Sequence, residues 1–227
     1  MSYPVKILKT DFVTHDVKRF ILEKPKDYQF EPGQATEVSI NLPDWKDEKH
    51  AFTFTSQNKD KVLEFIIKGY PVKDYPNHSG MTEALHHLEP GHELVIEDPW
   101  GTINYEGPGV FIAGGAGITP FIAILRHLRD QSQLEDNKLI FSNKTVKDII
   151  LEKEFEAMFP EEDLILTLTR QKKRGYPAQR IDQQFLESQI DNFDQNFYVC
   201  GPPKMVADIK QALQNLGADM QQIVFEE

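Results

Sequence analysis

The chain has 227 residues, of which 40% are hydrophobic and 27% charged, and its formal net charge is −11. This length fits one large domain or two domains of about 100 to 120 residues, each with enough apolar residues for a core. The acidic charge disfavours general binding to nucleic acid or to anionic membranes, because both need a positive field.

The single cysteine, Cys200, excludes an internal disulfide and a four-cysteine iron–sulfur cluster. The first residues, MSYPVK, lack the layout of a signal peptide, and no apolar run approaches the roughly 20 residues that span a bilayer. The histidines show no convergent ligand spacing, so we expect no metal site. We therefore expect a cytoplasmic, monomeric protein without a nucleic-acid or membrane partner.

The first half has the pattern of antiparallel β-structure. Short runs rich in Val, Ile, Phe and Thr are separated by turn residues such as Pro32-Gly33. One helix is predicted from Met81 to Leu88, capped by Ser79 and ended by Pro90-Gly91. The predicted strands are 5–13, 17–23, 35–42, 51–56, 62–68 and 93–96.

After Gly107-Pro108-Gly109 the pattern changes, and strands alternate with helices. Alternation of this kind predicts a parallel sheet, here of five strands, covered by helices on both faces. The predicted strands are 110–113, 138–142, 164–169, 197–200 and 223–225, and the predicted helices are 120–129, 151–159, 182–189 and 203–216. The sequence thus predicts two domains, residues 1–106 and residues 107–227.

A glycine-rich turn, AGGAGITP at residues 113–120, joins the first strand of this half to its first helix. Gly115 and Gly117 allow a tight turn and a close approach of ligand to backbone. The helix start offers free N–H groups to a pyrophosphate; Thr119 can cap the helix and donate its hydroxyl to phosphate, and Pro120 suits the first turn. Because the spacing is not G-x-G-x-x-G, a tight turn without a ligand is the alternative.

A second turn between a strand and a helix, YVCGPP, covers residues 198–203. Ligands of open α/β sheets bind beyond the carboxyl ends of the strands, so we expect Gly201 and Pro202 to line the same crevice as the first turn. Cys200 either belongs to this site or is a small buried apolar residue.

A basic run stands out in this acidic chain. Thr169 and Arg170 end the third strand of the second half, and Lys172, Lys173 and Arg174 follow. Guanidinium groups match phosphate geometry, so this run indicates recognition of the 2′-phosphate of NADP. A solvated loop is the alternative.

Together these features resemble the ferredoxin–NADP reductase family over nearly the whole chain. GGAGITP resembles its pyrophosphate loop, and Cys200-Gly201-Pro202-Pro203 resembles its C-G-P-P motif, whose cysteine lies near the nicotinamide. Asn143, in FSNK before DII, falls in a segment that lies near the adenine end of the nucleotide. The resemblance implies a Greek-key antiparallel β-barrel that binds FAD, joined to an α/β domain that binds NAD(P).

The flavin half of the resemblance includes two departures. FEPGQ resembles the turn before the flavin strand, and His50-Ala51-Phe52-Thr53 stands where the family carries R-x-Y-S or R-x-Y-T. Histidine in place of arginine weakens a counter-charge for the FAD phosphates, unless Lys68 or His78 compensates, and phenylalanine lacks the tyrosine hydroxyl. We expect FAD, with FMN as the alternative, and Thr53 keeps the hydroxyl near flavin N5.

The resemblance implies further site residues. Gly80-Met81-Thr82 resembles the family's second flavin stretch, where a helix start faces the FAD pyrophosphate, and Ile66 and Lys68 complete the implied cofactor set. Ile223-Val224-Phe225-Glu226 resembles the last strand, whose glutamate sits near the contact between flavin and nicotinamide. Roles in catalysis therefore fall on Thr53, Cys200 and Glu226.

The implied reaction passes hydride from NADPH, or alternatively NADH, to FAD and then electrons to a flavodoxin or ferredoxin. Those carriers are usually acidic, so like charges disfavour their encounter with this acidic chain. A small-molecule acceptor is therefore one alternative. A non-enzymatic flavin subunit of a larger complex is another, although such a subunit would not need the basic run.

Overall fold

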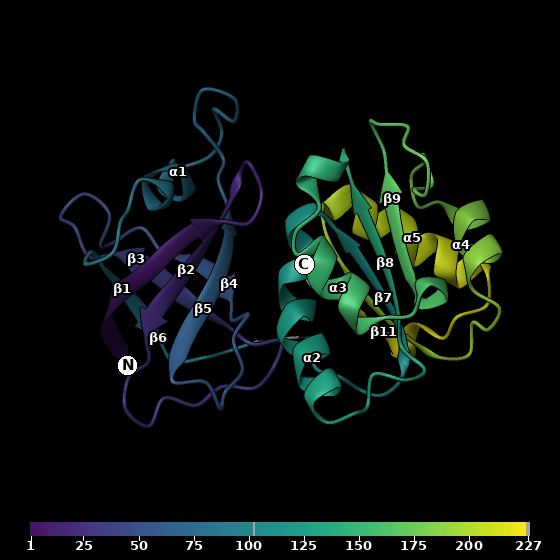
Figure 1. Ribbon diagram of the computed structural model, residues 1–227, viewed down its shortest axis with the longest axis horizontal. Helices are drawn as coiled ribbons and strands as arrows, with labels where there is room; N and C mark the ends of the chain where they lie inside the picture. The colour runs from purple at the N-terminus through teal and green to yellow at the C-terminus, as the bar shows by residue number, and fades with distance from the viewer. Residues whose placement is uncertain (102, 226–227) are drawn as a thin grey trace.

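The computed structural model describes residues 1–101 and 103–225. A β-rich half built from the first part of the chain lies beside an α/β half built from the second part (Figure 1). The elements of the first half are β1 (Ser2–Phe12), β2 (Val17–Glu23), β3 (Ala35–Ile40), β4 (His50–Thr53), β5 (Val62–Lys68), α1 (Met81–His86) and β6 (Glu93–Glu97).

The six strands of the first half form one antiparallel sheet in the order β4-β3-β6-β1-β2-β5. Side chains alternate along these strands, and one side of the sheet encloses a core that includes the fully buried rings of Phe20, Phe54 and Phe65. The predicted antiparallel near-barrel with one α-helix is confirmed for the described residues.

The start and end of α1 differ from the prediction. Ser79 is not the cap, because Gly80 takes that position with a φ of 89°, a left-handed conformation that glycine adopts readily. The Ser79 hydroxyl instead accepts a 3.4 Å hydrogen bond from the Met81 amide. At the other end the buried ammonium of Lys18 donates to the carbonyls of His86 and Leu88, at 3.1 and 2.8 Å.

The second half forms a parallel sheet in the order β11-β10-β7-β8-β9 with helices on both faces, as predicted. Residues of α2 and α3 pack on one face, and residues of α4 and α5 pack on the other. In the described part of the chain, no helix combines the length and apolar character that crossing a membrane requires. The elements are β7 (Gly109–Gly114), α2 (Thr119–Asp130), β8 (Lys138–Asn143), α3 (Glu152–Met158), β9 (Leu164–Leu168), α4 (Gln183–Gln189), β10 (Asn196–Cys200), α5 (Pro203–Asn215) and β11 (Ile223–Phe225).

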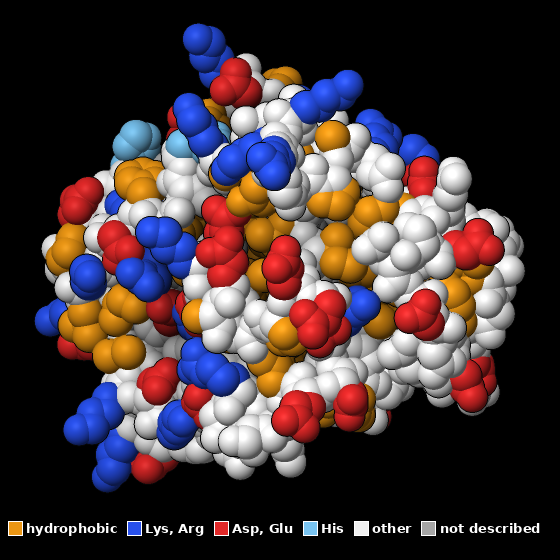
Figure 2. Space-filling model, turned by 45° about the vertical axis from the view of Figure 1, so that its right-hand side comes forward, with side chains coloured by type: hydrophobic (Ala, Val, Ile, Leu, Met, Phe, Trp, Pro, Cys, Tyr) orange, Lys and Arg blue, Asp and Glu red, His pale blue; other side chains and the backbone are white. Residues whose placement is uncertain are grey.

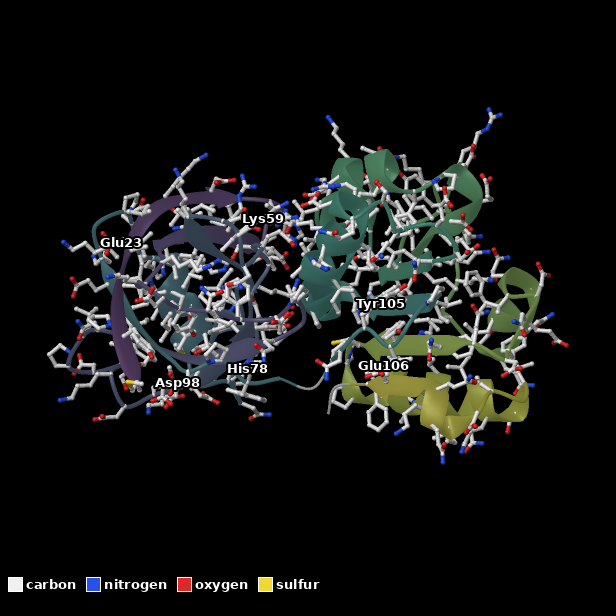
Figure 3. All side chains as sticks on the ribbon, turned by 90° about the horizontal axis from the view of Figure 1, so that it is seen from below. Glu23, Lys59, His78, Asp98, Tyr105 and Glu106 are labelled. Carbon is white, nitrogen blue, oxygen red and sulfur yellow. The ribbon has the colours of Figure 1, made fainter. Side chains whose placement is uncertain are left out.

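The connection between the two halves is fastened to the parallel sheet. β6 ends at Glu97 and β7 begins at Gly109, so the predicted boundary after residue 106 falls inside the connection. The Tyr105 ring stacks on Tyr198 of β10 at 5.9 Å, and the Glu106 amide donates to the Tyr198 hydroxyl at 2.9 Å (Figure 3). These contacts fix where the chain enters the second half.

His86, at the end of α1, makes the stability of the first half depend on pH. Its Nε2 donates to the Ile67 carbonyl at 2.9 Å, and burial lowers the pKa of His86 from its ordinary value of 6.5, because the charged ring loses hydration. Below that ordinary value the unfolded chain binds more protons than the folded chain, so acid destabilises the fold.

We therefore expect the free energy of unfolding to fall more steeply between about pH 7 and about pH 5.5 in the wild type than in His86→Gln, as measured by urea titration. Gln keeps a donor for the Ile67 carbonyl but does not titrate. Equal slopes for the two proteins would contradict this role of His86.

Candidate functional site

A cleft of about 750 Å³ opens between the two halves at the carboxyl edge of the parallel sheet. Its walls come from the ends of β7, β8, β9 and β10 on one side and from the segment around Tyr70 on the other. Lys and Arg side chains gather along the upper edge of the face in Figure 2, the edge toward which β8 and β9 point in Figure 1. This edge of an open α/β sheet is where ligands bind.

The two glycine-containing turns that were expected to share a crevice do line this one cleft. Gly115 and Gly117 follow β7, in a short 3₁₀ turn of residues Gly115–Ile118, and Gly201 and Pro202 follow β10. A β-carbon at position 117 would lie 2.5 Å from the Cys200 carbonyl oxygen and 2.6 Å from the Gly201 nitrogen. Glycine at 117 therefore lets the two turns pack backbone against backbone.

Thr119 does not cap α2, contrary to the prediction. Ile118 is the N-cap residue, and the Thr119 hydroxyl donates to the Ala116 carbonyl at 3.0 Å. The 3₁₀ turn extends the helix backward, so the first free N–H groups belong to the glycine turn rather than to Thr119. Pro120 is buried in the first turn as predicted, and neither Thr119 nor Pro120 is among the residues that line the cleft.

Asn143 carries the clearest mark of a missing ligand. It is the last residue of β8, its side chain is 4% exposed, and it lines the cleft. Among residues 1–101 and 103–225, neither its amide nitrogen nor its amide oxygen has a hydrogen-bond partner. A buried amide without partners costs about 1–3 kcal/mol, so this side chain fits a polar ligand that supplies both a donor and an acceptor.

Cations line the same cleft, but not all those expected from the basic run. Lys144 follows β8, Arg170 follows β9 beside Thr169, and Arg180 precedes α4. Over residues 1–101 and 103–225, no ion pair joins any of these three cations to a carboxylate. They are therefore available to an anionic ligand.

Arg174 lies outside the cleft lining, although the sequence placed it with Arg170. The loop turns through Gly175, with a φ of 89°, and the Lys173 ammonium lies 4.8 Å from the centre of the Tyr176 ring. The Tyr176 hydroxyl then donates to Glu152 of α3 at 2.6 Å, which draws the loop over that helix. The prediction missed Arg180 because no strand end precedes it.

The residues predicted to contact the flavin form β4, and none of them lines the cleft. His50 Nε2 lies 3.0 Å from Glu48 Oε1 and 3.2 Å from the Ser79 hydroxyl, which brings the start of β4 beside the start of α1. The hydrogen bond with His50 lowers the pKa of Glu48. A carboxylate thus stands next to the histidine that replaces the family's arginine.

The other residues of β4 differ in exposure. Ala51 is exposed, whereas the partly buried Phe52 packs against the core of the first half. Thr53 is partly buried and pairs with Ala35 of β3. The strand therefore presents one exposed small residue between two side chains of intermediate exposure.

The remaining predicted flavin residues divide between core and surface. Met81 is fully buried in the barrel core, and Ile66 packs with apolar residues of the second half. The Thr82 hydroxyl accepts a hydrogen bond from the Tyr70 amide at 3.2 Å, next to Gly80 at the helix cap. The side chains of Met81 and Ile66 are therefore not available to a ligand.

Lys68 does line the cleft, and it forms an ion pair with Asp16. Partial burial would raise the pKa of Asp16, but the hydrogen bond and charge of Lys68 outweigh burial and lower it. Because Asp16 already balances its charge, Lys68 is a weaker counter-charge for a phosphate than the three unpaired cations.

An aromatic group lines the cleft from the first half, and its two tyrosines, Tyr70 and Tyr75, were not predicted from the sequence. The Tyr70 and His78 rings stack with centres 4.7 Å apart, and Tyr75 packs edge-on against Tyr70 at 5.1 Å. All three line the cleft. The sequence does show these three rings close together in the loop between β5 and α1. Such a loop has no core to fill, so clustered rings in it could have indicated a binding role.

Cys200, which has a predicted role in catalysis, is not among the residues that line the cleft. It is the last residue of β10 and is 8% exposed. Its carbonyl oxygen lies against Gly117 of the glycine turn. Glu226 lies outside the described residues. The structure thus brings together the nucleotide-binding residues more completely than the catalytic ones.

Comparisons with known proteins divide the chain in the same way. Residues 4–105 match the oxidoreductase FAD-binding domain, and residues 111–211 match the oxidoreductase NAD-binding domain. Inducible nitrate reductase [NADH] 1 of Glycine max is 28% identical over 96% of this chain, which spans 28% of its length. The glycine betaine monooxygenase reductase subunit of Chromohalobacter salexigens is 28% identical over 95% of this chain, which spans 61% of its length.

A similar fold is found in a ferredoxin NADP+ reductase from Neisseria gonorrhoeae with bound FAD and NADP. The TM-score is 0.84 at 20% identity, and the match covers 99% of this chain and 98% of that chain. The orphaned Asn143 amide and the glycine cradle agree with a nucleotide cofactor. The chain therefore belongs to the ferredoxin–NADP reductase-like family, with an oxidoreductase FAD-binding domain followed by an oxidoreductase NAD-binding domain.

Proposed function

We propose that the protein oxidises NADPH through FAD and reduces a flavodoxin- or ferredoxin-like carrier. When bound, the nicotinamide supplies a hydride, and the flavin holds the two electrons for release to the acceptor. The protein's own contribution is to bind and orient both groups, with the glycine turn and Asn143 holding the nucleotide. The roles of Thr53, Cys200 and Glu226 beside the reacting rings stay predictions.

The preference for NADPH rests on one observation, the three unpaired cations in the cleft. Lys144, Arg170 and Arg180 line it in a chain whose net charge is −11. The extra phosphate of NADPH is the anion that distinguishes it from NADH, and a guanidinium binds such a group with charge-assisted hydrogen bonds. The soybean relative is named for NADH, so the choice of nucleotide is tested separately below.

For FAD, the structure supports a site at the joined starts of β4 and α1. The hydrogen bonds among His50, Glu48 and Ser79 keep these two segments together. Backbone N–H groups near Gly80 and the exposed Ala51 leave room for a diphosphate and a ring system beside them. Tyr70 adjoins both regions, because its amide donates to the Thr82 hydroxyl in α1 and its ring lines the nucleotide cleft with those of Tyr75 and His78.

A second candidate acceptor is the terminal component of an oxygenase. The reductase subunit of Chromohalobacter salexigens supports it, because the similarity extends over 95% of this chain. The chain spans 61% of that subunit. Reduction of a flavodoxin or ferredoxin by the purified protein, compared with reduction of an oxygenase component, separates the two.

The direct test is an anaerobic titration of the purified protein. We expect a flavin spectrum, and we expect NADPH to bleach it at lower concentration than NADH. A protein without flavin absorbance after addition of FAD would overturn the proposal. Equal bleaching by both nucleotides would overturn the preference for NADPH only.

We expect Arg170→Ala to raise the KM for NADPH about tenfold or more, since a hydrogen bond to a charged group contributes about 1.5–3 kcal/mol. The KM for NADH should change by less than about twofold, because NADH lacks the phosphate. Arg174→Ala is the matched control, an exposed arginine of the same loop that does not line the cleft. Steady-state kinetics with both nucleotides measures this, and equal effects of the two variants would contradict it.

We expect Asn143→Leu to stabilise the ligand-free protein by about 1–3 kcal/mol in urea unfolding while weakening nucleotide binding, because the buried amide has no partners. Asn137→Leu is the matched control. Asn137 is equally buried, but its amide oxygen accepts from Gly109 N at 3.2 Å and its amide nitrogen donates to carbonyls. That variant should lose stability, and stability loss in both variants would argue against a ligand role for Asn143.

A further inference from the structure

Arg126, in α2, lies at the centre of a polar network that joins the two halves. Its Nε and Nη2 donate to the two carboxylate oxygens of Glu154 in α3, at 2.6 and 2.9 Å. Its Nη1 donates across the domain boundary to Glu64 Oε1 at 2.6 Å and to the Thr55 carbonyl at 2.7 Å. The side chain is only 14% exposed. One guanidinium therefore binds both halves at once.

The barrel side of this network is held in place by its own bonds. Glu64, in β5, is 8% exposed and accepts from the Thr55 hydroxyl at 2.8 Å, while its amide donates to the Ser56 hydroxyl at 3.0 Å. Burial would lower the pKa of Arg126, but the hydrogen bonds and charges of Glu154 and Glu64 raise it above its ordinary value. Four of the five N–H groups of the guanidinium are thus bonded in a charged network.

Two further contacts tie the barrel to the same helix. Gln57 Nε2 donates to the Ala123 carbonyl of α2 at 2.8 Å inside the interface. Lys59 pairs with Asp130 at the end of α2 at 2.7 Å, and this pair is at the exposed margin where the halves meet (Figure 3). The segment 55–59 therefore runs along α2 and is bonded to it at three levels.

These bonds connect a segment next to the predicted flavin strand with the helix that follows the nucleotide-binding turn. Thr55 comes two residues after β4, the predicted flavin strand, and α2 comes directly after the glycine turn that lines the nucleotide cleft. From Thr119 to Arg126 the helix rises roughly 10 Å, so a tilt of about 6° at Arg126 would shift the turn by about 1 Å. Hydride transfer is sensitive to displacements of this size.

The apolar packing around the network constrains the angle between α2 and the barrel less than the network does. Val17 and Ile66 of the barrel pack with Ile118 and Ile124 of the second half, and such contact is non-directional. A forked guanidinium bound to a carboxylate has a fixed geometry, and breaking one arm leaves a buried charge unpaired. The network therefore adds a directional constraint to the contact between the halves.

We propose that Arg126 is a positioning residue that sets the relative orientation of the two halves and so aligns the bound nucleotide with the flavin. This inference rests on the proposed function for its effect on hydride transfer. Its effect on orientation does not, because the network is present in the protein without ligands. The two effects can accordingly be measured apart.

The orientation is tested on the ligand-free protein by residual dipolar couplings, which report how two domains sit relative to each other. We expect the couplings of both halves of the wild type to fit one orientation. Those of Arg126→Gln should need a different or broader set, and those of Arg126→Lys should lie between. Lys59→Ala, which removes the exposed pair, is the control and should match the wild type.

The alignment is tested by stopped-flow reduction of the flavin at saturating NADPH, together with the Kd of NADPH. We expect Arg126→Gln to slow reduction at least tenfold while Kd changes less than twofold, and Lys59→Ala to change neither. A merely structural arginine would lower thermal stability and leave the rate of the folded protein unchanged, and that result would overturn the proposal.

If Arg126→Gln does not fold, Glu64→Gln replaces it, because this variant keeps the fork from Arg126 to α3 and weakens only the charged bond that crosses to the barrel. It should shift the couplings and the rate in the same direction, by less. Wild-type couplings in either variant would refute the positioning role. A wild-type flavin that neither nucleotide reduces would refute the proposed function alone.

Discussion

The functional edge of the molecule depends on the contact between two backbone turns that lie more than eighty residues apart in the chain. Gly117 approaches the carbonyl of Cys200 and the nitrogen of Gly201 so closely that no β-carbon fits between them. Because β7 and β10 are neighbours in the parallel sheet, this contact brings their carboxyl ends together. The crevice beside it is bounded by backbone N–H groups, and the side chains after β8 and β9 then complete it.

The sequence predicted the elements well because their signals are periodic, whereas caps and loops depend on contacts that sequence spacing does not record. Ser79 and Thr119 both stand where a hydroxyl commonly caps a helix. In the structure Gly80 makes the turn into α1, and a 3₁₀ turn carries α2 back to Gly115, so each hydroxyl bonds elsewhere. The helices were predicted, but the way they begin was not.

The basic run shows that the site, too, depends on tertiary contacts. Arg170 follows a strand, and parallel strands end at one edge, so its place in the cleft could be predicted. Arg174 does not line the cleft, and Tyr176 of the same loop binds Glu152 instead. Arg180, which follows this loop in the chain, lines the cleft. Tyr70 and Tyr75 line it from the other half of the molecule. Only the tertiary structure brings these residues together.

The departure at His50 has a consequence for how the barrel would hold FAD. An arginine is charged at every physiological pH, whereas a histidine carries charge only when protonated. Here the neighbouring carboxylate of Glu48, 3.0 Å from His50 Nε2, offsets even that charge. The diphosphate would then depend on backbone N–H groups near Gly80 more than on side-chain cations, and a backbone site is effective only if its geometry is held. Lys18, which donates to the carbonyl of His86 at the end of α1 and to that of Leu88 just beyond it, helps to hold that helix in place.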